Sequence, residues 1–227
     1  MFRNIFNSGG SVEETILSVL VIVIPALLCI TIHELAHGFT AYRLGDSAAK
    51  DMGRLTLNPI KHIDPIGLLM MVIFRFGWAK PVPVNMYTFK YPKRYMAVTA
   101  FAGPLSNLIL ALFAMFLYGL LFIPISSINS AATAAFITEL FINIIWLNIM
   151  LAVFNMLPIP PLDGSKILFS VLSEESYYKL MRYERFGMFF LIIALNIPGV
   201  RGMLSTVTNT LFTSFSLVGD TALRLVN

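Results

Sequence analysis

The amino-acid sequence predicts an all-α polytopic membrane protein with four to five transmembrane helices and a short extended or re-entrant segment after the first. Of its 227 residues, 57% are hydrophobic and only 12% are charged, and the mean hydropathy is +0.79. Soluble globular domains carry about a quarter charged residues. No charged residue occurs between Arg94 and Glu139, a stretch long enough for two helices across a bilayer. These observations favour a membrane protein over a soluble one.

Five apolar segments define the predicted spans. The first has no small-residue cleavage pattern at its end, so we expect a retained helix rather than a signal peptide. The second is expected to begin at Pro104, because proline favours the first turn of a helix. The fifth either spans the membrane or lies at its interface. We place the spans at about 15–40, 104–123, 134–157, 183–197 and 203–218, within a single membrane-embedded domain, 1–227.

The segment 43–100 differs from the spans in composition. It holds nine of the sixteen Lys and Arg residues, together with several Gly and Pro residues. Within it, the sequence DPIGLLMMVIFRFGW is too short to span and is expected to lie at the interface or to re-enter the bilayer. The sequence KPVPVNMYTF is expected to be extended, because residues that precede proline are disfavoured in the α region.

The distribution of positive charge predicts the topology. The loop after the first span holds nine Lys and Arg residues, the loop between the second and third spans holds none, and 166–185 holds four. Since basic loops face the cytoplasm, we expect a multi-pass protein of the cell membrane with its N-terminus outside and both basic segments in the cytoplasm. The same distribution argues against nucleic acid as a partner, although the net charge is +4.

The sequence HELAH lies at the end of the first span. His33 and His37 are four residues apart, a spacing that places both imidazoles on one face of a helix. Such a pair can supply two ligands of a tetrahedral zinc ion, and Glu34 is placed to act as the general base. The alternative is a chance match in which backbone or Asn groups satisfy the histidines. Ionisable groups are costly at membrane depth, which favours the metal site.

A catalytic zinc ion needs a third protein ligand and one open position. Asp163 is the only acidic residue between Glu139 and Glu174, and it follows the third span. The predicted topology places the end of that span on the same side of the membrane as the histidines. Prolines at 158, 160 and 161 end the helix and let the carboxylate turn inward. Asp163 is therefore the expected third ligand, although its local sequence alone would indicate only a solvated turn.

Other polar residues near these motifs allow two interpretations each. Asn155 is a candidate donor to the substrate carbonyl or the developing oxyanion, with an interhelical hydrogen bond as the equal alternative. For Asn148 the interhelical hydrogen bond is preferred. Cys29 lies one turn before the first histidine on the same face, but a third ligand from that helix would strain the geometry, so packing is preferred. His62 and Asp64 are alternative ligands, but a structural role at the interface is preferred.

The motifs H-E-L-A-H and N-M-L-P-I-P-P-L-D-G together resemble the site-2 protease family of intramembrane zinc metalloproteases. The stretches GRLTLNPIKHIDPIG, FGWAKPVPVN and AGPLSN are similar to its compact branch without PDZ or CBS domains, and the resemblance covers about 30–167. It implies a single metalloprotease domain with one zinc ion per chain, bound by His33, His37 and Asp163, and with Glu34 as the base. The sequence matches the family pattern at all four positions.

The resemblance implies an endopeptidase that hydrolyses peptide bonds in or near transmembrane segments, as in regulated intramembrane proteolysis. Its expected partners are the lipid bilayer and single-span membrane proteins or signal-peptide-like substrates. A substrate helix must unwind locally, and the stretch 81–89 is a candidate to hold it by strand addition. One alternative is a membrane transporter or metal carrier that uses His, Glu and Asp as an ion relay, which would spread these residues over several spans. Another is a non-catalytic scaffold, which the intact Glu34 disfavours.

Overall fold

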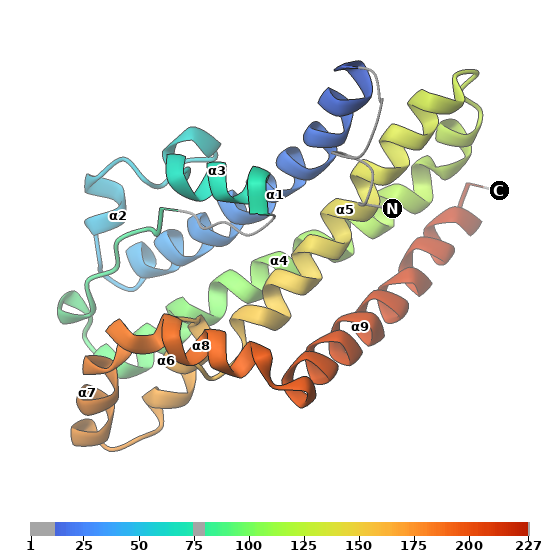
Figure 1. The fold of residues 1–227 in the computed structure, drawn as a ribbon. Coiled ribbons are helices and arrows are strands. Elements are labelled where there is room, and N and C mark those ends of the chain that lie inside the picture. Colours follow the sequence, from blue (N-terminus) through green and yellow to red (C-terminus); the bar gives the residue numbers. More distant parts are fainter. Residues whose placement is uncertain (1–11, 75–79, 227) are drawn as a thin grey trace.

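The structure is a computed structural model that describes residues 12–74 and 80–226 (Figure 1). No strand occurs within these two ranges, and the all-α fold class is confirmed. The α-helices are α1 Val12–Arg43, α2 Ala48–Asp51, α3 Pro65–Phe74, α4 Pro92–Ser126, α5 Ala131–Asn155, α6 Asp163–Ser170, α7 Glu174–Arg182, α8 Gly187–Asn196 and α9 Pro198–Arg224. Three short 3₁₀ helices join them: η1 Pro59–Lys61, η2 Met86–Thr88 and η3 Glu184–Phe186.

Helix α4 forms the centre of the bundle. It packs against α1, α5, α6 and α9, and α1 also packs against α5 (Figure 1). Gly119 lets α4 approach α9 closely, since a Cβ atom there would lie 2.2 Å from the carbonyl oxygen of Gly219. Small residues at such crossings are typical of helix packing in membranes. The buried core between α4 and α5 consists of Ala111, Ala114, Met115, Ile145 and Ile149.

Three helices of the described ranges are long and apolar enough to cross a membrane: α1 over Thr15–Arg43, α4 and α5. The segments Glu174–Asn196 and Pro198–Arg224 qualify only together, as a pair bent by 84° at the break between them. The described part of the chain therefore has three candidate spans, or four if this bent pair is one span. The predicted fifth span, 203–218, lies inside α9. The assignment of the whole chain to one domain stays a prediction.

The start of the second span differs from the sequence prediction. Helix α4 begins at Pro92, and Pro104 is buried inside it. The preference of proline for the first helical turn is met by Pro92 instead. Packing against neighbouring helices lets a transmembrane helix tolerate an internal proline. The additional turns before Pro104 matter for the site, because they place Thr99 beside α1.

Short elements lie between α1 and α4 in the sequence. Helix α3 has ten residues, fewer than the roughly 20 needed to span a bilayer. The end of the predicted interfacial segment, 75–78, lies outside the described residues, so its position stays a prediction. Residues 80–85 form neither helix nor strand, and we call them the strap. The predicted extended stretch, 80–89, is therefore shorter than expected, because Met86–Thr88 forms η2.

Candidate metal centre

The two histidines of HELAH face the same side of α1. Their Nε2 atoms are 3.0 Å apart. Both side chains are largely buried, with exposed fractions of 8% for His33 and 12% for His37. Because α1 continues to Arg43 without a break, the two imidazoles are held one turn apart, as the spacing predicted.

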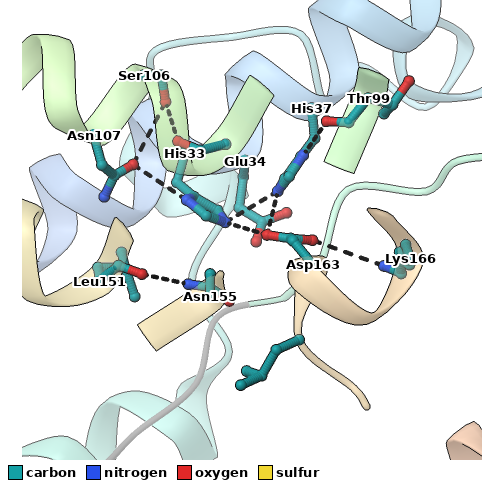
Figure 2. A network of polar contacts seen from close by, with 12 residues as sticks. His33, Glu34, His37, Thr99, Ser106, Asn107, Leu151, Asn155, Asp163 and Lys166 are labelled. Atoms are coloured by element: carbon teal, nitrogen blue, oxygen red, sulfur yellow. Dashed lines mark hydrogen bonds and ion pairs between the residues drawn. The ribbon is translucent and has the colours of Figure 1, made fainter. Parts of the chain in front are cut away.

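Asp163 approaches the two histidines from the start of α6. Its Oδ2 atom lies 3.1 Å from His33 Nε2 and 3.2 Å from His37 Nε2, and Figure 2 shows the three side chains converging on one point. Gly164 permits this approach, because a Cβ atom there would lie 2.3 Å from the carbonyl oxygen of Met156 at the end of α5. The Asp-Gly pair thus lets α6 begin directly against the end of α5.

The three converging atoms fit a zinc ion. They form a group of potential metal ligands within 4.8 Å of one another. Their separations of 3.0 to 3.2 Å are close to the ~3.3 Å expected between tetrahedral ligands that lie 2.0–2.1 Å from zinc. Gly103 of α4 leaves room beside them, because a Cβ atom there would lie 2.4 Å from His37 Nε2. Three protein ligands leave one tetrahedral position open, as catalytic zinc sites require.

Both histidines are oriented by hydrogen bonds to α4. His37 Nδ1 lies 2.7 Å from the carbonyl oxygen of Thr99, and His33 Nδ1 lies 3.1 Å from Asn107 Oδ1 (Figure 2). These oxygens only accept, so each Nδ1 donates and each Nε2 presents its lone pair to the centre. Two nitrogen lone pairs and a carboxylate oxygen that face one another repel, and a metal cation between them would remove this repulsion. Orientation of metal-ligating histidines through the other ring nitrogen is a common feature of metal sites.

Glu34 lies beside the ligand atoms. Its Oε2 atom accepts a hydrogen bond from the backbone N–H of Val82 in the strap, at 2.7 Å. Glu34 shares a cavity of about 420 Å³ with the three ligands, and Pro81, Val82 and Val84 of the strap line the same cavity. The arrangement joins a metal-ligand group, a carboxylate next to it and a cavity that both line.

Lys166 adds a positive charge to this cavity. Its Nζ atom lies 3.9 Å from Oδ1 of Asp163, the carboxylate oxygen that does not face the histidines (Figure 2). The side chain is about one-quarter exposed, and it lines the cavity together with Asn155. The two oxygens of Asp163 therefore contact different partners.

The two asparagines of α5 have different surroundings. Asn155 lines the cavity, and its Nδ2 atom donates to the carbonyl oxygen of Leu151 at 3.0 Å. Asn148 is fully buried and donates to Cys29 Sγ at 2.8 Å. That contact joins α5 to α1, as expected for an interhelical hydrogen bond, and it places Cys29 in the core, outside the ligand group.

His62 and Asp64 make structural contacts. His62 is buried, and its Nε2 atom lies 2.8 Å from the carbonyl oxygen of Thr56. Asp64 accepts hydrogen bonds from the N–H groups of Ile66 and Gly67 at the start of α3. Neither residue belongs to the metal-ligand group found among the described residues, and these contacts favour the structural interpretation.

Sequence reasoning missed the contributions of α4 and the strap. Thr99, Gly103 and Asn107 recur every four residues and so lie on one face of the helix. With the start of α4 set at Pro104, two of them fell outside the predicted helix, which hid the pattern. No sequence signal links Val82 to Glu34, because the contact uses a backbone N–H.

Comparison with known proteins gives a second, independent line of evidence. A family model described as peptidase family M50 matches residues 120–195, which include Asp163. The chain is 42% identical over 180 residues to "Putative zinc metalloprotease YwhC" of Bacillus subtilis, an alignment that covers 78% of this chain and 80% of that protein. This chain belongs to peptidase family M50. The M50 peptidase is a zinc metalloendopeptidase with several membrane-spanning helices, and the predicted membership of the site-2 protease family is confirmed.

Other relatives share this designation. "Putative zinc metalloprotease Rip2" of Mycobacterium tuberculosis strain H37Rv is 32% identical over 190 residues, covering 82% of the M50 peptidase and 70% of the relative. "Putative zinc metalloprotease MJ0611" of Methanocaldococcus jannaschii is 34% identical over 103 residues, covering 45% and 49%. No solved structure matches the chain.

Proposed function

We propose that this M50 peptidase hydrolyses peptide bonds within or beside transmembrane segments of other membrane proteins. The position of the candidate centre supports this proposal. His33 and His37 lie on α1 and Asp163 follows α5, and both helices are long and apolar enough to cross a membrane. A centre built between two such helices favours substrates that are themselves held in the bilayer.

The residues of the cavity have distinct proposed roles. The three ligands would hold the zinc ion, which supplies Lewis-acid polarisation of the scissile carbonyl and of the attacking water when bound. Glu34 accepts a proton from that water at the carboxylate oxygen that Val82 does not hold, and passes it to the leaving amine nitrogen. Asn155 uses its second amide hydrogen to donate to the substrate carbonyl oxygen as negative charge develops there.

Single-span membrane proteins and signal-peptide-like segments are the proposed substrates. A helical substrate must unwind before its amides can reach the centre, because helical hydrogen bonds occupy them. The strap lines the cavity, and its non-helical backbone offers Val84 for binding an unwound segment by strand addition, because the N–H of Val82 is already held by Glu34. The charge distribution along the chain supports a cell-membrane location with the N-terminus outside and the centre near the cytoplasmic side.

Cleavage by the purified full-length protein tests the proposal. In detergent or liposomes, wild type should cut a single-span substrate, and Glu34→Gln should keep zinc and lose about 10²–10⁴-fold in rate, since glutamine cannot accept a proton. Asp163→Asn should lose zinc as well as turnover, because a neutral amide is a poorer ligand than a carboxylate. Glu175→Gln, at an exposed position on α7, is the matched control and should cleave like wild type.

Two results would contradict the proposal. Cleavage by Glu34→Gln at nearly the wild-type rate would remove Glu34 from the role of base. Zinc transport into liposomes by wild type, without cleavage of any membrane substrate, would favour the ion-relay alternative instead.

A further inference from the structure

The strap holds the proposed base in place through its backbone. The N–H group of Val82 donates to Glu34 Oε2 at 2.7 Å. The residues on both sides of Val82 are prolines, which have no N–H to donate to a neighbouring strand. Because the strap forms no ladder with another segment of the described chain, its position depends on other contacts.

Asp46 holds the C-terminal end of the strap. This residue follows α1, and Gly45 before it has a φ of 108°, a conformation that favours glycine and turns the chain inward. The Asp46 side chain is buried, with 1% of the residue exposed. One carboxylate oxygen accepts from the Asn85 N–H at 2.6 Å, and the other accepts from the Ala48 N–H at 3.0 Å.

Arg54 holds the N-terminal end of the strap. It is also buried, with 6% exposed. Its Nη2 atom donates to the carbonyl oxygens of Lys80, at 2.6 Å, and Pro81, at 3.3 Å. The N–H group of Lys80 donates in turn to the carbonyl oxygen of His62 at 3.0 Å. Both ends of the strap are thus bound by buried charged side chains or by backbone.

Asp46 and Arg54 are unusual because neither forms an ion pair within the described residues. A buried charge is costly unless it is compensated. Here the compensation comes from backbone groups, and the hydrogen bonds found for the Arg54 side chain, both from Nη2, go to the strap. The charges are therefore used to fix the strap rather than to neutralise each other.

We infer that Asp46 and Arg54 are positioning residues that fix the strap, so that the Val82 N–H holds the Glu34 carboxylate beside the metal ligands. The inference rests on the proposed role of Glu34 as the base. Neither residue touches the ligand atoms, so replacing Asp46 or Arg54 should reduce turnover while zinc stays bound. Misplacement of a reacting group by about 1 Å can cost 10²-fold in rate.

Asp46→Asn tests the inference with almost no change in volume. An amide has one acceptor oxygen, and its NH₂ group would face the second N–H donor. We expect kcat to fall about 10- to 100-fold with a smaller change in KM, unchanged zinc content, and faster hydrogen–deuterium exchange in the strap peptide. Asp51→Asn, on the exposed side of α2, is the matched control and should match wild type in all four measurements.

Arg54 provides a second variant pair. Arg54→Lys keeps a donor that can reach one strap carbonyl and should retain more activity than Arg54→Met, which keeps the length of the side chain without a donor.

Loss of zinc in parallel with activity in Asp46→Asn and Arg54→Lys would indicate a general structural role and overturn the inference. So would wild-type kcat in Asp46→Asn, or unchanged exchange of its strap peptide. Absence of cleavage by wild type would instead contradict the proposed function, while the exchange measurements would still test whether Asp46 and Arg54 fix the strap.

Discussion

Replacing Gly103 by alanine should remove zinc without unfolding the bundle. A Cβ atom at this position would lie 2.4 Å from His37 Nε2 and 2.7 Å from His33 Cε1. Ordinary contacts of a Cβ atom begin near 3.4 Å, so an imidazole must move by about 1 Å or α4 must withdraw. Metal sites tolerate deviations of about 0.2 Å in ligand distance. One methyl group therefore displaces a ligand well beyond that tolerance.

The expected loss of zinc affinity is at least about 100-fold, the upper end for changes next to a metal ligand. This corresponds to about 2.8 kcal/mol of binding free energy. The clash also costs the zinc-free fold about 1–3 kcal/mol in packing, which is partly offset because alanine is favoured over glycine inside a helix by up to about 1 kcal/mol. The thermal unfolding midpoint of the zinc-free protein should therefore fall only slightly below that of wild type, with the bundle still folded.

Competition with a chelator measures the zinc affinity, and a thermal unfolding scan of the chelated protein measures the stability of the fold. Gly202→Ala is the matched control: it makes the same chemical change inside α9, where a Cβ atom would meet nothing within 4 Å. Its zinc affinity should equal that of wild type. Wild-type affinity in Gly103→Ala would refute the reasoning, since it would show that the ligand group does not lie against this face of α4.

Two further predictions concern orientation and topology. Asn107→Leu removes the acceptor for His33 Nδ1 and should weaken zinc binding about 10- to 100-fold. Asn148→Leu, an equally buried change away from the ligands, should not, and equal zinc affinity in both variants would contradict the proposed orientation of His33. Ser127 lies between α4 and α5. In a Cys29→Ala background, the cysteine of Ser127→Cys should react with an impermeant thiol reagent from outside the cell. Reaction from the cytoplasmic side alone would contradict the proposed topology.

The candidate ligands were predictable from the sequence because residue spacing and the distribution of charge along the chain suffice to find them. His33 and His37 share one helical face by spacing alone. Asp163 was found because no other acidic residue lies between Glu139 and Glu174, and because the charge of the loops placed it on the side of the histidines. The all-α fold followed from long uncharged apolar segments. None of these inferences requires the angle between two helices or the distance at which they pack.

The supporting contacts were not predictable, because they depend on how α4 packs. This helix has apolar residues on every face, so hydropathy does not show which face meets α1. Pro104 also misled the prediction of its start, since Pro92 occupies the first turn. The contacts of Asp46 and Arg54 with the strap join side chains to backbone groups 26 to 39 residues away, and backbone groups carry no residue-specific signal.

The residues around the centre therefore divide into two groups with different measurable effects. Helix α4 supplies none of the three candidate ligands, yet Thr99, Gly103 and Asn107 orient the imidazoles or leave them space. Changes that disturb these contacts should lower zinc affinity first and turnover only as a consequence. The strap contacts Glu34 instead, so changes at Asp46 or Arg54 should lower turnover at full zinc occupancy. Zinc content and kcat measured on the same preparations separate the two groups, because a bundle that merely loosened would lose both together.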